Sequence, residues 1–302
     1  MGKHFVEELL KTGKHEVTAI ARQDSQSFIP SGVDVAKVNY DDETSLVSAL
    51  KGQQFLIITL AATVPPDTHS KIVRAAVKAG VSYIMPNAYG FDITNKALVE
   101  DLPIGKNGLN YCSEIEGLGA SYIVLTCSFW YEWSLGLGEA FYGIDVRTKR
   151  AVFFDDGNLK IYTSTWKQCG RALAALLSLP ESGAEVSLQN WKNKSFYISS
   201  FRVSQRDMLD SIHRVTGSTD ADWEITYEPS EQRYKKGMED MMKGDRMGFA
   251  RALYSRAFFP DGSGDYRNGL DNEVLKLPKE ELDEATKKTI EMVESGWNPL
   301  AH

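Results

Sequence analysis

The sequence has little cysteine, few histidines and no excess of positive charge. Three cysteines in 302 residues are an odd and small number, which favours reduced core thiols in a cytoplasmic protein over a disulfide framework. Lys and Arg number 34 against 41 Asp and Glu, a net charge of −7. This balance argues against a nucleic-acid partner. The five histidines show neither metal-ligand nor triad spacing, so we assign no metal site.

Long apolar runs are also missing. No stretch approaches the length that a membrane-spanning helix needs, and the amino end has no signal-peptide pattern. We therefore expect no membrane contact and a cytoplasmic location. A hydrophobic content of 42% and a charged content of 25% are typical of a globular enzyme with a substantial core.

The sequence does contain a regular alternation of helices and strands. Helices are predicted at residues 2–12, 41–50, 67–79 and 107–118, and buried strands at 16–21, 33–40, 55–62, 81–85 and 122–127. Glycines at 13, 52 and 80 stop the first three helices. This alternation predicts an α/β fold, a Rossmann-type doubly wound parallel sheet with right-handed crossovers.

The first helix begins directly at Gly2, and the strand after it ends at Arg22. Together they form the second half of a dinucleotide-binding βαβ unit, whose first strand and Gly-rich turn do not precede Gly2. In the strand order 3-2-1-4-5 that strand is central. We therefore expect its neighbours to be left unpaired or forced together, and cofactor binding to be impaired in this short form.

The regular alternation of helices and strands becomes less clear beyond residue 135. We expect residues 1–135 to form an NAD(P)-binding domain and residues 136–302 a smaller α+β region that serves as substrate wall and lid. A hairpin is predicted over 150–162, and later helices over 163–177 and 279–293. Ser204 and Asp207 are spaced as a helix-opening capping box.

Ligands of such sheets bind beyond the carboxyl ends of the strands. Arg22 ends one strand where an acidic residue would receive the ribose of NAD; an arginine suits the 2′-phosphate of NADP. A solvated surface arginine is the alternative. Leu60, Ala61 and Ala62 end the next strand, where small residues admit a cofactor or simply belong to the core.

Residues 86–92, with the form Pro-x-x-aromatic-Gly-x-Asp, resemble the loop of the isoflavone-reductase-like, NmrA-like branch of the atypical short-chain dehydrogenases. Gly2-Lys3, Ala21-Arg22 and residues 129–132 are similar to that family too. Residues 153–157 and 294–299 resemble its fungal CipA-like oxidoreductases. The resemblance implies a Rossmann domain, NADP(H) and the reduction of a small, often aromatic or phenolic, substrate.

The resemblance also implies site residues. For the cofactor they are Gly2, Lys3, His4, Arg22, Leu60, Ala61, Ala62, Pro86 and Asn87, and for the substrate they are Tyr89, Trp130 and Tyr131. Turn stabilisation by Asn87 and a packed ring for Tyr89 are equally good interpretations, and aromatic clusters are usually core. No Tyr-x-x-x-Lys pair occurs. Lys106 is the candidate catalytic lysine. When the chain is aligned with the family on the strand that follows, Lys106 comes slightly before the expected position, and a surface lysine is the alternative interpretation.

Two functions fit these residues. The first is an NADP(H)-dependent oxidoreductase, in which the cofactor supplies the chemistry and the protein the orientation. The second is a non-catalytic, NmrA-like regulator that senses NADP and binds a protein partner. The poor register of Lys106 favours the regulator, and the aromatic residues at 129–133 favour the enzyme.

Overall fold

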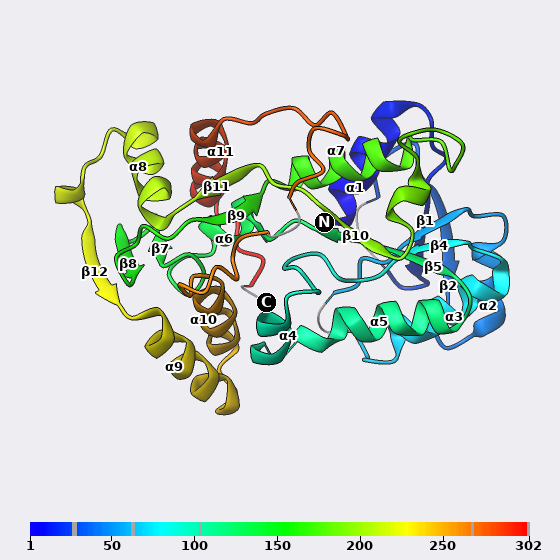
Figure 1. Ribbon diagram of the computed structural model, residues 1–302, viewed down its shortest axis with the longest axis horizontal. Helices are drawn as coiled ribbons and strands as arrows, with labels where there is room; N and C mark the ends of the chain where they lie inside the picture. Colours follow the sequence, from blue (N-terminus) through cyan, green and yellow to red (C-terminus); the bar gives the residue numbers. More distant parts are fainter. Residues whose placement is uncertain (26–28, 62–63, 103, 267–268, 301–302) are drawn as a thin grey trace.

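The computed structural model describes residues 1–25, 29–61, 64–102, 104–266 and 269–300, and Figure 1 shows its two halves side by side along the long axis. The first half alternates helices and strands as predicted. Its elements are α1 (Gly2–Thr12), β1 (Thr18–Arg22), β2 (Asp34–Val38), α2 (Glu43–Leu50), β3 (Phe55–Ile57), α3 (Thr68–Ala79), β4 (Tyr83–Met85), α4 (Lys96–Asp101), α5 (Gly105–Gly117) and β5 (Ser121–Thr126). The parallel α/β architecture is confirmed.

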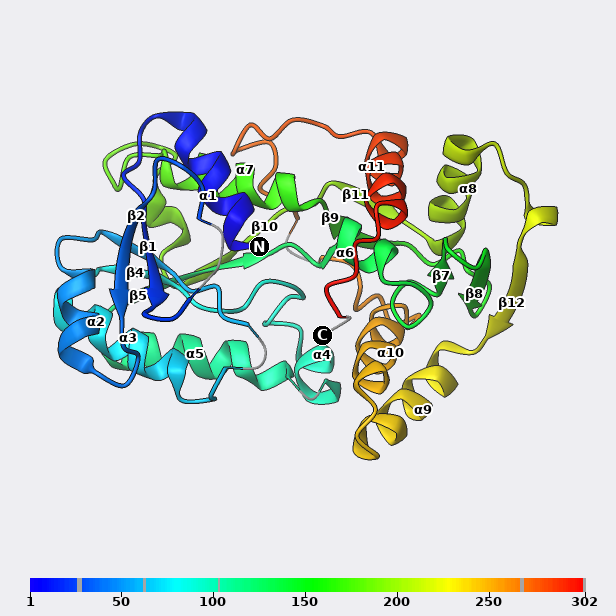
Figure 2. The same cartoon turned by 180° about the vertical axis from the view of Figure 1, so that it is seen from behind.

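Strand pairing divides this half into two sheets. One has the order β10-β5-β4-β3 and is parallel throughout; the other is the parallel pair β1-β2. Among the described residues β1 and β3 do not pair, so of the two outcomes that the sequence allowed, the strands are left unpaired and not forced together. In Figure 2 the β1-β2 pair runs across the direction of β4 and β5.

Two elements from beyond residue 135 complete the first half. β10 (Lys194–Tyr197) pairs with β5, and α7 (Trp166–Leu177) packs along α1. One apolar cluster joins them, because Phe5 and Leu9 of α1 share a core with Cys169 and Leu173 of α7. The chain therefore returns to the first sheet after it has begun the second half.

The second half is a mixed α+β region. Its remaining elements are β6 (Phe129–Trp130), α6 (Tyr131–Gly136), β7 (Ile144–Asp145), β8 (Arg150–Phe154), β9 (Ile161–Ser164), the 3-10 turns η1 (Leu188–Trp191) and η2 (Asp220–Asp222), β11 (Phe201–Val203), α8 (Gln205–Thr216), β12 (Glu224–Glu228), α9 (Ser230–Met242), α10 (Arg246–Ala257) and α11 (Leu282–Glu294). The predicted hairpin over 150–162 is wrong. β8 pairs with β7 and β12, whereas β9 pairs with β6 and β11, because cross-sheet partners outweigh the local turn at Gly157.

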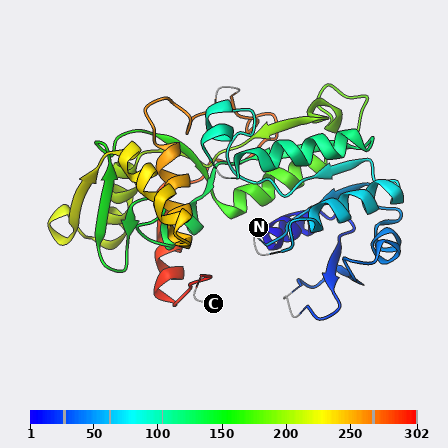
Figure 3. The same ribbon diagram turned by 90° about the horizontal axis from the view of Figure 1, so that it is seen from below.

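The two halves have separate cores. Tyr131, Phe153 and Leu209 belong to the core of the second half, and Leu46, Val73 and Ile84 to a layer below the first sheet. Figure 3 shows the halves from below, with the first residues of α1 near the junction. All three cysteines are buried and free, as the sequence predicted. In the described part of the chain no helix is both long and apolar enough to span a membrane.

Candidate functional site

The loop after β4 is fastened to the end of β3 by Asn87. Its side-chain amide accepts from the Leu60 backbone N–H and donates to the Leu60 carbonyl, both at 3.2 Å. These two bonds continue the β3-β4 ladder beyond the last paired residues. Asn87 therefore holds two predicted ligand-binding segments at one place on the carboxyl edge of the sheet.

His69 contacts the same loop. The sequence predicted no role for it, because the spacing of the histidines fits neither a metal site nor a triad. Its Nε2 accepts from the Asn87 backbone N–H at 3.4 Å, and its ring stacks on Tyr111 with the centroids 3.7 Å apart. Burial lowers the pKa of His69 to about 4, so the ring is neutral and can accept this bond at physiological pH. The other ring nitrogen, Nδ1, is buried without a hydrogen-bond partner among the described residues, so the stack on Tyr111 and the bond from Asn87 are what hold the ring in place.

Tyr89 uses its hydroxyl within the protein. The Tyr89 Oη–H donates to the Ile58 carbonyl at 2.8 Å, and the ring contacts Phe5 edge-on with the centroids 5.3 Å apart. Burial raises its pKa well above the usual value for tyrosine. The hydroxyl can donate to a substrate only if it gives up the bond to the Ile58 carbonyl, whereas its oxygen can still accept a hydrogen bond. Pro86, one turn earlier, is buried.

The start of α1 meets the same edge. A Cβ on Gly2 would lie 2.8 Å from Oγ1 of Thr59, so a larger residue here would require the Thr59 side chain to shift. The first turn of α1 contains no acidic residue, and Lys3 adds a positive charge to the amino end of the helix dipole. These features fit an anion such as a pyrophosphate. The His4 ring instead stacks on Trp166, with the centroids 5.3 Å apart.

Arg22 lies at the exposed end of β1. Its guanidinium pairs loosely with Asp24, at 3.7 Å, and two-thirds of the side chain is accessible, so it is free to meet a phosphate. Ala61 is exposed next to Leu60, whereas Ala62 lies outside the described residues. Lys106 is exposed in the first turn of α5.

Between β1 and β3 lies a cavity of about 1080 Å³. Thr18, Ile20, Ile57 and Thr59 line its two long sides, and Gly2 and Lys3 lie at its rim. Among the predicted cofactor residues, the structure thus brings Gly2, Lys3 and Leu60 to this cavity, with Asn87 bonded to Leu60. Arg22 and Pro86 are not part of its lining.

The aromatic residues after β5 separate into two environments. Tyr131 is fully buried in the core of the second half, and its hydroxyl bonds Oγ1 of Thr286 at 2.7 Å. Trp130 is half-buried and meets Trp133 edge-on, with the centroids 6.2 Å apart. Trp130 is therefore better placed than Tyr131 to line a pocket.

Glu132, between these aromatics, is a half-buried acid for which the sequence predicted no role. Its Oε2 accepts the backbone N–H of Trp166 at 3.0 Å. Burial raises the pKa of Glu132 to about 7, so this carboxyl group gains or loses its proton near neutral pH. An acidic residue inside the run Phe-Trp-Tyr-Glu-Trp was the signal available in the sequence.

A second, small cavity of about 20 Å³ lies where the two halves meet. We call it the seam cavity; it is lined by Phe91, Asp92, Leu98, Leu102, Ser128, Phe129, Leu253, Ala257, Ser263, Gly264 and Tyr266. Ser128 adopts a left-handed backbone conformation with φ of 54°, which is strained for a residue with a side chain. Apolar walls with a few convergent polar groups are typical of small-molecule sites.

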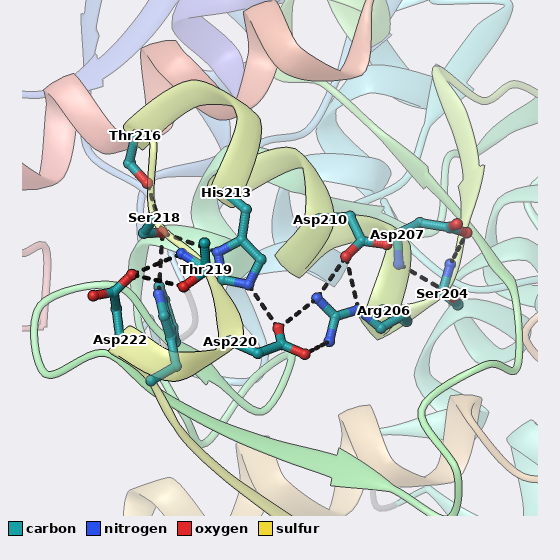
Figure 4. Close-up of polar contacts among 11 residues, drawn as sticks. Ser204, Arg206, Asp207, Asp210, His213, Thr216, Ser218, Thr219, Asp220 and Asp222 are labelled. Atoms are coloured by element: carbon teal, nitrogen blue, oxygen red, sulfur yellow. Dashed lines mark hydrogen bonds and ion pairs between the residues drawn. The ribbon is translucent and has the colours of Figure 1, made fainter.

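A group of side chains at the end of α8 contains the residue types of a catalytic triad, serine, histidine and aspartate, but does not function as one. Figure 4 shows His213 between Ser218, 2.9 Å from Nδ1, and Asp220, 2.8 Å from Nε2. Asp220 is also bound by Arg206, which lowers its pKa, and Ser218 accepts from the Trp223 indole at 3.3 Å. Both ends are occupied, so the group closes the carboxyl end of α8 and is structural.

Comparisons with known proteins agree with this geometry. Residues 1–102 match a family model described as NAD(P)H-binding. The chain is 26% identical to the oxidoreductase aprR of Aspergillus flavus over 94% of its length and 93% of that protein. It is 24% identical to the isoflavone reductase homolog IRL of Zea mays, with 86% and 90% covered.

A solved structure has the same fold. The NADPH-dependent quinone oxidoreductase QOR2 of Escherichia coli, complexed with NADPH, superposes with a TM-score of 0.70 at 18% identity over 96% of both chains. At this identity the likeness concerns the fold, and the fold is of the Rossmann type that the sequence predicted.

Proposed function

The chain belongs to the isoflavone-reductase-like, NmrA-like branch of the atypical short-chain dehydrogenases, and on this basis we propose that it is an NADP(H)-dependent reductase of a small aromatic or phenolic molecule. The observation that carries the proposal is the convergence of three segments within the matched residues. The start of α1, the end of β3 and the loop after β4 meet at one edge, where Gly2 approaches Thr59 and Asn87 binds Leu60.

We assign the cofactor to residues of that edge. The amino end of α1, with Gly2 and Lys3, would hold the pyrophosphate, and Arg22 would meet the 2′-phosphate. Leu60 and Ala61 would flank the cofactor, and Pro86 and Asn87 would fix the loop beside it. His4 would support the helix from its stack on Trp166. When bound, NADPH supplies a hydride.

The substrate would enter at the seam cavity, between the loop after β4 and α10. Phe129 and Leu253 offer flat apolar walls, and Asp92 and Ser128 offer polar groups to orient an oxygen. The three candidate substrate residues, Tyr89, Trp130 and Tyr131, are not among the residues that line this cavity, so they would contact the substrate only after the lid has moved. The cavity of about 20 Å³ holds about one water, so an aromatic substrate requires the lid to move.

Lys106 remains our candidate for the group that protonates the substrate. It lies in the first turn of α5, the second helix after the loop carrying Asp92. The relatives named above are an oxidoreductase and a reductase homolog, which favours the enzyme over the regulator that the sequence also allowed.

The test follows NADPH absorbance with a panel of phenolic ketones, enones and quinones. We expect turnover with at least one of them, and a preference for NADPH over NADH. Arg22→Ala should weaken NADPH binding by roughly tenfold, measured by calorimetry, and leave NADH binding unchanged, because one exposed charge-assisted contact is worth about 1 to 2 kcal/mol. Lys287→Ala, which removes an exposed cation on α11, is the control.

The role of Lys106 is tested with the active substrate. Lys106→Ala should lower kcat by roughly a hundredfold, the usual contribution of a positioned acid, without changing the Kd for NADPH. An unchanged kcat would exclude Lys106. NADPH binding without turnover of any compound would leave the regulator as the remaining function.

A further inference from the structure

The two sheets of the first half present facing edges to the cavity between them, and within the described residues neither edge has a strand partner. In parallel strands the N–H and C=O of one residue point to the same side, and successive residues alternate. Ile58 donates to Met85, so Leu56 and Ile58 face β4, and Ile57 and Thr59 face the cavity. Val17 accepts from Asp34, so Ala19 faces β2, and Thr18 and Ile20 face the cavity.

The side chains around the cavity are also those of a sheet interior. Thr18, Ala19, Ile20 and Ile57 are only half-buried, although strands of a doubly wound sheet are normally covered on both faces. Phe5 and Leu9 of α1 line the cavity from one side, and Leu50 of α2 and Ile72 of α3 line it as well. A molecule in this cavity therefore meets apolar groups on its faces and backbone donors and acceptors along its edges.

We propose that this cavity, which we call the strand gap, binds an extended apolar polypeptide strand that runs parallel to β1 and β3 and joins the two sheets into one. Only a peptide backbone offers donors and acceptors at strand spacing to both edges. The parallel direction follows from the flanking strands, each of which has a parallel partner. The strand ends beside Gly2, because Gly2 lies against Thr59, just past the end of β3.

The length and composition of the strand follow from its surroundings. β1 has five residues, so a matching strand of five residues spans about 17 Å. The helix residues that cover the two faces, Phe5, Leu9, Leu50 and Ile72, are apolar, although Glu16 and Gln54 also belong to the lining. A run of valine and isoleucine therefore fits better than an alternating pattern. The gap of about 1080 Å³ is at the upper end of the range of small-molecule pockets.

The experiment adds a synthetic peptide to the whole purified chain. The peptide has two lysines for solubility, five alternating valines and isoleucines, and a Gly-Gly-Ser tail; the control peptide has proline at the central position, which removes a ladder donor. We expect the first peptide to bind saturably and to raise Tm by about 5 °C at a hundredfold excess over its Kd. The proline peptide should bind about tenfold more weakly.

A variant of the protein tests the edge from the other side. Ile57→Pro removes an N–H that faces the gap and spares the ladder to β4, so peptide binding should weaken by about tenfold; Ile57→Val is the matched control. If the proline variant does not fold, the chain with the valine-isoleucine strand fused before Met1 through three glycines should melt at a higher temperature than a fusion with the proline strand.

Other results would overturn the proposal. Equal shifts from the two peptides would mean that the gap takes any apolar molecule. Displacement of the peptide by a second copy of the chain, seen as a concentration-dependent dimer by sedimentation, would make the gap a self-association site. Absence of binding to both peptides, with equal melting of the two fusions, would show that the gap accepts no strand. None of these measurements requires NADPH turnover, so they test the strand gap independently of the proposed reductase activity.

Discussion

Glu132 makes the stability of the folded chain depend on pH. Its pKa is about 7 in the folded state against 4.5 when exposed, so the folded state holds the proton that the unfolded state releases. The stabilisation is complete below about pH 4.5 and is lost as the pH rises through 7, by about 3 kcal/mol at most. Glu132→Gln should remove this slope, because glutamine keeps an acceptor for the Trp166 N–H and carries no charge.

The measurement is the free energy of unfolding of both proteins at pH 5 and pH 8. From pH 5 to pH 8, the free energy of unfolding of the variant should rise relative to that of the unchanged protein by about 1 to 3 kcal/mol. This is roughly the amount that the raised pKa of Glu132 implies. Comparing differences across pH cancels the constant cost of the new amide. A parallel pH dependence in the two proteins would contradict a raised pKa at Glu132.

Asn87 is the residue that ties the two ligand-facing segments together. Asn87→Ala leaves the N–H and C=O of Leu60 without their partners, which should lower the free energy of unfolding by about 1 to 3 kcal/mol. Asn87→Asp should recover little of this, because a carboxylate accepts from the N–H and repels the carbonyl. Urea unfolding measures the change.

Asn110 provides the control for this prediction. It is exposed on α5, so Asn110→Ala should change stability by less than about 0.5 kcal/mol. If Asn110→Ala lowers the free energy of unfolding as much as Asn87→Ala does, the two hydrogen bonds between Asn87 and Leu60 contribute nothing specific to stability. The sequence allowed either a turn-stabilising or a ligand-binding Asn87; its two bonds to Leu60 are structural, and its contact with a cofactor remains a proposal.

At the scale of single elements, local sequence signals were reliable where the chain supplies its own partners. The capping box at Ser204 and Asp207 is present, with the Ser204 hydroxyl accepting from the Asp207 N–H at 3.1 Å and Asp207 accepting from the Ser204 N–H at 2.9 Å. These bonds lie within four residues, so the spacing alone predicts them. The hairpin over 150–162 failed because its strands find their partners elsewhere in the chain.

The capping box gives an element-scale prediction. Ser204→Ala should destabilise the chain by about 1 kcal/mol, the usual value of an N-cap hydroxyl, with urea unfolding as the measurement. Ser182→Ala, an exposed serine in the loop after α7, should be neutral. If the two variants unfold at the same urea concentration, the cap at α8 contributes less than its geometry indicates.

At the scale of the whole molecule, the sequence predicted the parallel sheet, because buried apolar runs and glycine stops are local features. It left open whether the strands on either side of the central position would stay apart or be forced together. It could not predict that β10 returns to pair with β5, since pairing across some seventy residues has no local signal. Glu132 and His69 were missed as perturbed groups for the same reason. Their pKa values depend on burial by segments distant in the sequence.

The strand gap predicts uneven stability across the first half. β1 and β2 form a two-stranded sheet in which most residues of β1 are half-buried and most of β2 are exposed, whereas β5 is paired on both sides and almost fully buried. Regions with few buried contacts open at low free energy. Amides of β1 and β2 should therefore exchange with deuterium at least a hundredfold faster than those of β5, measured by mass spectrometry.

Adding the valine-isoleucine peptide shows whether fast exchange in β1 comes from the unfilled strand gap or from low stability of the whole chain. If a strand fills the gap, the amides of Thr18 and Ile20 gain partners, and protection of β1 should rise towards that of β5 while α9 and α10 stay unchanged. Protection that rises everywhere would indicate only tighter global folding. Equal exchange of β1 and β5 before any addition would show that the two-stranded sheet is stable by itself, and that β1 has no need of a third strand.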